Sequence, residues 1–164
     1  MSEIPSVINR VMQAVTDVQL DIEIDLAATP GFPTSVRQAY PYQRWNYASQ
    51  QCPFFANQLK GGPVSVLASR GDHEVASNCE MYLCLLPESQ GELLESNEEY
   101  VLRWRDAVFA AFSGHLRLGG DIPELLVAHV TKWDWGVFDL GDTPYFALFF
   151  NLTIIETLPL EVGI

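Results

Sequence analysis

The segment at residues 145–155, YFALFFNLTII, constrains the fold most, because it is apolar on both faces of a strand. Such a strand has to be covered on both sides, which places it in the centre of a sheet. Residues 125–135 predict a strand, and residues 136–144, which contain Gly141 and Asp142, predict a turn. We therefore expect the two strands to pair as a C-terminal hairpin.

The segment before this hairpin predicts a long helix over residues 97–116. Ser96 and Glu99 have the spacing of a capping box. The sequence Leu118-Gly119-Gly120 then supplies a stop signal. The apolar side of the helix is expected to carry Val101, Trp104, Val108, Ala111, Phe112 and His115.

The front of the chain changes its hydrophobic period. Residues 4–18 repeat apolar side chains every three or four positions, which predicts a helix. Residues 21–26 alternate strictly, which predicts a strand whose outer face carries Asp21, Glu23 and Asp25. Two further strands are expected at residues 64–68 and 74–86.

Residues 30–53 hold no period and are rich in proline, glycine and aromatic side chains. A stretch of this length inside a compact domain is usually functional or disordered. We expect an extended arm that becomes ordered against a neighbouring subunit. Its aromatic residues are the predicted subunit interface: Phe32, Tyr40, Tyr42, Trp45 and Tyr47.

These elements predict one α+β domain over residues 1–164. Its mostly antiparallel sheet is expected to have an N-terminal helix and a second long helix before a C-terminal β-hairpin. The length of 164 residues suits a single domain with a real hydrophobic core.

The net charge of −12 disfavours nucleic-acid binding, because an acidic surface repels phosphate backbones. The chain has no apolar run of membrane-spanning length, and residues 1–17 lack the pattern of a signal peptide. The chain has three cysteines, a small and odd number that argues against a disulfide framework. We expect a soluble protein made in the cytoplasm, without membrane contact.

The candidate chemical groups favour structural roles. Asp21, Glu23 and Asp25 are expected about 6–7 Å apart along one strand, so they do not converge on a metal ion unaided. Cys79 and Cys84 are expected on opposite strand faces. His73, His115 and His129 accompany no nucleophile elbow, and the sequence has no phosphate-binding loop. We predict no enzyme activity, no cofactor and no metal.

Trp133 and Trp135 form the most unusual local pattern, because both are expected on one strand face. Packing against the long helix or against another subunit is the ordinary interpretation. A binding site for a small molecule, built from the two rings, is the alternative.

The back half of the chain resembles tail terminator proteins of long-tailed bacteriophages. The resemblance lies in the helix YVLRWRDAVFAAF at residues 100–112, the following LGG at 118–120, and the strand YFALFFNLTIIE at 145–156. In that family a helix of the type dxvxxAfxxxL precedes a hairpin whose last strand has the pattern yxgvxfxlxVxE. The short segment CPFFA at 52–56 also fits. Ala147 and Leu148 depart from the usual start of the last strand, which leaves other neck and tail-completion proteins open.

The resemblance implies a structural protein of the virion that forms a homohexameric ring on the finished tail tube. The ring would stop tube polymerisation and join the tail to the head, with the tail tube protein and a head-completion or connector protein as partners. DNA would pass through the lumen without specific binding. The acidic residues Asp21, Glu23 and Asp25 are predicted to line this lumen or a rim.

Overall fold

The sheet and helices belong to a computed structural model that describes residues 6–25, 32–44, 46–67, 72–90, 98–114 and 117–159. Its described residues form two α-helices, two short 3-10 helices and six strands. The helices are α1 (Val7–Leu20), η2 (Ser49–Gln51), η3 (Glu88–Gln90) and α3 (Glu98–Ser113). The strands are β1 (Gln38–Tyr40), β2 (Phe54–Lys60), β3 (Val64–Leu67), β4 (Asp72–Pro87), β5 (Leu125–Leu140) and β6 (Thr143–Pro159).

The strands form one sheet in the order β1-β2-β4-β6-β5, with β3 paired to β4 beyond the end of β2. Every pairing is antiparallel except that of β1 with β2. β6 lies between β4 and β5, as the prediction of a central strand required. The predicted α+β fold is therefore confirmed, with its N-terminal helix and a second helix before the C-terminal hairpin.

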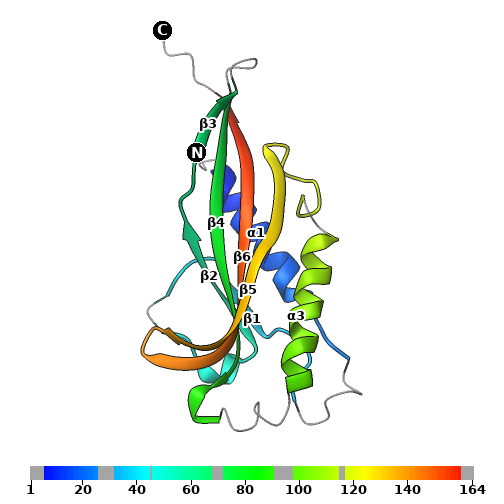
Figure 1. The fold of residues 1–164 in the computed structure, drawn as a ribbon, viewed down its shortest axis with the longest axis vertical. Coiled ribbons are helices and arrows are strands. Elements are labelled where there is room, and N and C mark those ends of the chain that lie inside the picture. Colours follow the sequence, from blue (N-terminus) through cyan, green and yellow to red (C-terminus); the bar gives the residue numbers. More distant parts are fainter. Residues whose placement is uncertain are drawn as a thin grey trace, which may run out of the picture.

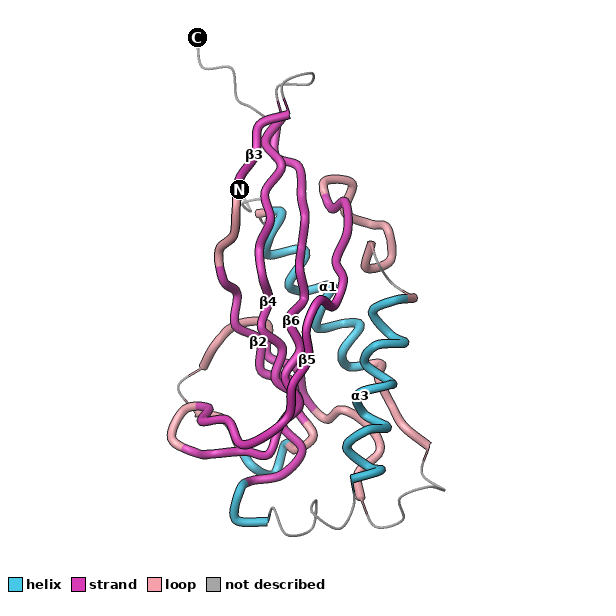
Figure 2. The backbone as a smooth tube through the Cα atoms, viewed as in Figure 1, coloured by secondary structure: helices cyan, strands magenta, loops and turns pink. Residues whose placement is uncertain are grey.

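Both α-helices cover the same face of the sheet. In Figure 1, α1 crosses behind the strands and α3 lies beside it, while the turn end of the β5–β6 hairpin curves away from α3. The trace in Figure 2 shows the same arrangement. α1 places Val11, Met12 and Val15 in the core, and α3 places Trp104 and Phe112 there.

The core has two parts, one on each face of the sheet. The larger part lies under the helices and includes Met81, Leu148 and Phe150. The smaller part lies on the opposite face, where Tyr40, Tyr47 and Cys52 pack with Phe54 and Tyr145. Neighbouring residues such as Phe54 and Phe55 belong to different parts because successive strand side chains alternate in direction.

The boundaries of the helices and the hairpin differ slightly from those predicted. α1 starts after Ser6, whose hydroxyl accepts a hydrogen bond from the Asn9 amide. Ser96, Asn97, His115 and Leu116 lie outside the described residues, so the capping box stays a prediction. β5 continues through Gly136 to a two-residue turn, where Gly141 takes a φ of 65°. A glycine first in such a turn is typical of type II′ hairpins.

The strand predicted at residues 21–26 is wrong over residues 21–25, and Leu26 lies outside the described residues. α1 continues to Leu20 and Asp21 forms its C-cap. The Asp21 amide donates to the Val18 carbonyl, and the Ile22 amide donates to the Gln19 carbonyl. Beyond it, Glu23 makes a single isolated bridge to Ser35. Alternating exposure survives without the strand, since Ile22 is buried while Asp21 and Glu23 are exposed.

Neither α-helix within the described residues has both the length and the apolar character that a membrane crossing requires.

Candidate functional site

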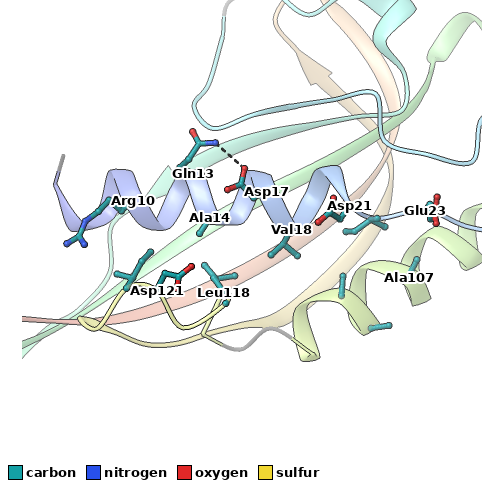
Figure 3. A pocket seen from close by; sticks show the side chains of 15 residues that line it. Arg10, Gln13, Ala14, Asp17, Val18, Asp21, Glu23, Ala107, Leu118 and Asp121 are labelled. Atoms are coloured by element: carbon teal, nitrogen blue, oxygen red, sulfur yellow. Dashed lines mark hydrogen bonds between the residues drawn. The ribbon is translucent and has the colours of Figure 1, made fainter. Parts of the chain in front are cut away.

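The three acidic residues singled out in the sequence are exposed, and two of them lie at a groove. Asp21 and Glu23 line a cavity of about 690 Å³ between α1, α3 and the turn at residues 118–122. Figure 3 shows Asp17, Asp21 and Glu23 following one another along the α1 side of this cavity. Asp25 is exposed as well, but it is not among the residues lining the cavity.

We call this cavity the α1–α3 groove. Its apolar floor comes from Ala14 and Val18 of α1 and from Ala107, Ala110 and Ala111 of α3. Four acidic side chains lie around this floor: Asp17, Asp21, Glu23 and Asp121. The cation lining the groove is Arg10, whose guanidinium lies 3.1 Å from a carboxylate oxygen of Glu124.

The predicted aromatic arm packs on its own subunit. Tyr40 and Tyr47 are buried, and the Tyr47 ring stacks on Phe54 with 5.3 Å between ring centroids. The Tyr145 hydroxyl donates to the Tyr47 carbonyl at 3.1 Å. Phe32 contacts Tyr100 of α3, with ring centroids 4.7 Å apart. Their role at a subunit interface stays a prediction.

Two arm residues stand apart from this packing. Tyr42 keeps 43% of its surface exposed, and its hydroxyl bonds to the side chain of Asn9 on α1. Trp45 lies outside the described residues. Tyr42 is therefore the described arm residue that a second subunit can reach without rearrangement of the fold.

Trp133 and Trp135 lie on the helix-covered face of β5, as their pairing opposite Phe150 and Leu148 requires. Trp133 packs against α3, with its ring edge-on to Phe109 and under the Arg105 guanidinium, 4.8 Å from the ring centroid. Both rings stay 36% and 41% exposed.

Two further apolar side chains continue this surface, which we call the β5 strip: Leu102, Trp133, Trp135 and Val137. Leu102 of α3 is 41% exposed and Val137 is 45% exposed. A cavity of about 130 Å³ separates Trp135 from α3 and does not include Trp133 in its lining. That volume is below the usual range for a drug-sized ligand.

The cysteines are inert thiols in the core. Cys52, Cys79 and Cys84 are free and buried. Burial raises the pKa of Cys52 and of Cys79 to about 12, so both stay protonated at neutral pH. Within the described residues, no three His, Cys, Asp or Glu side chains are grouped to hold a metal ion.

A buried amide pair under α1 escaped the sequence prediction. Gln19 and Asn57 are fully buried and exchange two side-chain hydrogen bonds of 2.8 Å. Asn57 also donates to the Tyr40 carbonyl at 2.8 Å. This pair ties α1 to β2 and β1. The available signal was a glutamine four residues after Val15, on the apolar side of the helix.

A second buried polar group lies on β6. Glu156 is 4% exposed, and its Oε2 has no hydrogen-bond partner among the described residues. Burial raises the pKa of Glu156, and the nearby Glu124 carboxylate raises it further. The alternation of β6 predicts that Glu156 shares the face of Ile154, so its burial was open to inference.

No family model matches the chain, and no curated protein matches it.

Proposed function

We propose that this protein is a viral assembly protein that forms a ring by self-association. The ring caps the end of a phage tail tube, stops its polymerisation and joins the tail to the head connector. The observation that carries the proposal is the β5 strip, an exposed apolar surface beside the open edge of the sheet.

The open edge supports association because, among the described strands, β5 pairs with β6 alone. Proteins usually protect such edges with charges, prolines or covering segments. The nearby charges are Lys132 and Asp134. Their register partners on β6 are Asn151 and Phe149, so their side chains point to the sheet face opposite the helices. The helix-covered side therefore presents two tryptophans and a valine along the outer strand, an arrangement typical of protein interaction sites. The Trp135 amide donates to Asp134 Oδ1 at 2.8 Å.

The opposite end of the sheet offers a different apolar surface. Leu59 at the end of β2 is 37% exposed, and Val64 at the start of β3 is 61% exposed. Contact between the β5 strip of one subunit and this edge of the next is heterologous. Heterologous contacts close into rings when the rotation between subunits permits it.

The acidic charge suits a ring through which DNA passes. A net charge of −12 repels phosphates, so such a lumen would not retain the DNA. Asp21, Glu23 and Asp25 are exposed, as a position on the lumen or on a rim requires.

Size-exclusion chromatography with light scattering on the full chain tests the ring. We expect a hexamer, or a concentration-dependent shift from monomer to hexamer. The double variant Trp135→Glu/Val137→Glu should shift this equilibrium toward the monomer by at least about tenfold.

The matched control is Leu126→Glu, because Leu126 is 43% exposed on the same strand. It lies nine residues from Trp135, or about 30 Å along a strand. The control should keep the wild-type oligomer. A strict monomer at all concentrations, or equal loss in control and double variant, would contradict this interface.

Tube capping is tested with polymerising tail tube protein. Added full-length protein should end tube growth and appear at one tube end by electron microscopy. The double variant should fail to do so. Binding to the head connector without binding to tube ends would instead identify a neck adaptor.

A further inference from the structure

The α1–α3 groove is a second surface, distinct from the β5 strip. We propose that it binds a basic amphipathic helix of a partner protein. The partner is a different protein from this chain, and the groove binds it whether or not the ring forms.

The floor of the groove has the shape for a helix. Ala107, Ala110 and Ala111 present only methyl groups, so the backbone of an incoming helix can approach α3 closely. On the α1 side, the lining extends from Arg10 to Asp21. From Arg10 to Asp21 there are eleven steps of about 1.5 Å, so the lining spans roughly 16 Å, which matches about three turns of a bound helix.

The charges around the floor specify a basic occupant. Asp17, Asp21, Glu23 and Asp121 make no ion pair within the described part of the chain, whereas Arg10 is already paired with Glu124. Lysine or arginine side chains flanking the apolar face of a bound helix would meet these carboxylates. Complementary charges of this kind give an interface its specificity and its association rate.

The position of two of these carboxylates supports a role in binding. Asp17 and Asp21 lie at the C-terminal end of α1, which has no basic residue in its last turn. The helix dipole favours cations at this end and disfavours anions. The two aspartates are therefore unfavourable to the helix dipole, although Asp17 accepts a hydrogen bond from Gln13 Nε2 at 3.3 Å. A cation from a partner would compensate both carboxylates and the helix end.

The described helices of a second copy of this chain do not supply a basic helix for the groove. The arginines on the described helices are Arg10, Arg103 and Arg105, and each already pairs with a carboxylate. Nucleic acid is excluded by the same acidic side chains.

The groove is also separate from the ring surface on the same helix. Leu102 of the β5 strip and Ala111 of the groove are nine residues apart, which places them on opposite sides of α3. One surface can therefore be altered without the other.

The test measures binding of dye-labelled synthetic peptides to the full chain by fluorescence anisotropy. The probe is a 14-residue amphipathic helix of leucine, alanine and lysine. One comparison peptide replaces lysine with glutamate, and another scrambles the order to remove the apolar face. We expect binding of the probe that weakens with salt, none of the glutamate peptide, and at least tenfold weaker binding of the scrambled peptide.

Two groove variants test the electrostatic and the steric contributions to binding separately. Asp17→Lys/Asp21→Lys reverses the rim charge, and Ala111→Trp fills the floor. Each should weaken binding of the probe by about tenfold or more. The matched control Glu88→Lys/Asp139→Lys reverses two exposed carboxylates outside the groove and should reduce binding less than threefold.

Equal loss in the control, unchanged binding by both groove variants, or equal binding of the scrambled peptide would overturn the proposal. The variant Trp135→Glu/Val137→Glu should still bind the probe. A protein that forms hexamers but does not bind the probe refutes the groove alone, and one that binds it as a strict monomer refutes the ring alone.

Discussion

The core under α1 and the outer half of β5 differ in which side chains they bury. Under α1, the amides of Gln19 and Asn57 are fully buried and bonded to each other. On β5, Trp135 and Val137 keep 41% and 45% of their surfaces exposed. The first region buries polar groups, and the second exposes apolar groups to water.

The difference separates stability from association. A buried amide is tolerated when its hydrogen bonds are made, and it then fixes the position of the helix that carries it. An exposed tryptophan adds little to folding beyond its buried part, but it stabilises a contact that covers it. Substitutions in the first region should change unfolding, whereas those in the second should change assembly.

The largest expected effect is on the buried amide pair. Asn57→Leu leaves the Gln19 amide and the Tyr40 carbonyl buried without their partner, so it should destabilise the fold by about 3 kcal/mol in urea unfolding. The double variant Gln19→Leu/Asn57→Leu should recover part of this loss, because no unpaired amide remains. A single-variant loss below about 1 kcal/mol would show that the pair does not fix α1.

The β5 strip should show the opposite response. In Trp135→Glu/Val137→Glu, the free energy of unfolding of the monomer should change by less than about 1 kcal/mol, because both side chains are already half exposed. Association should weaken by at least tenfold, measured by light scattering across a dilution series. Strong destabilisation of the monomer would show that the β5 strip stabilises the fold, and the difference between the two regions would then not hold.

Glu156 is expected to give a smaller effect that depends on pH. Burial raises its pKa above the ordinary 4.5, so the folded protein binds this proton more tightly than the unfolded chain. The contribution of Glu156 to stability is therefore full below pH 4.5 and is lost as the pH rises through the raised pKa.

Glu156→Gln removes this loss, because glutamine carries no charge at any pH. It should stabilise the protein by about 1 kcal/mol at pH 7 and leave stability unchanged below the ordinary pKa. Urea unfolding over a pH series measures the change, with Glu88→Gln as an exposed control that stays flat. A variant less stable than the wild type at pH 7 would mean that the charged carboxylate has a stabilising partner.

The smallest expected effect is at the end of α1. Asp17→Lys/Asp21→Lys places cations where the helix dipole favours them, so it should stabilise the fold by about 0.5–1 kcal/mol. Thermal unfolding at low salt measures it, and Asp17→Asn/Asp21→Asn should give about half the gain. A loss of stability would show that these carboxylates hold the fold together.

Strong periodic segments made most of the fold predictable from the sequence. The apolar positions of α3 and the two apolar faces of β6 are set by local spacing, and both elements form where they were expected. The boundary between α1 and the acidic segment was not predictable in this way. Alternation at residues 21–25 suits a strand, but a strand also needs a partner. Among the residues that the structure describes, this segment has only the Glu23–Ser35 bridge.

The candidate surfaces were less predictable, because they depend on contacts between distant residues. Trp133 and Trp135 were expected on one strand face, and their pairing confirms this. The arm looked free because it has no period, yet Tyr40 and Tyr47 are buried over β2 and β6. Nothing in the local spacing of residues 10–23 or 107–122 indicates that they face each other across a groove.

The position of β6 near the end of the sequence determines when the sheet can form during synthesis. β4 and β5 both depend on β6 for their longest pairing, and β6 occupies residues 143–159. A growing chain on the ribosome therefore exposes β4, residues 72–87, without its main partner until this late strand has emerged. During that interval α1 and α3 have half a sheet to pack on. We expect the nascent protein to stay open, and able to bind chaperones, until its last strand is made.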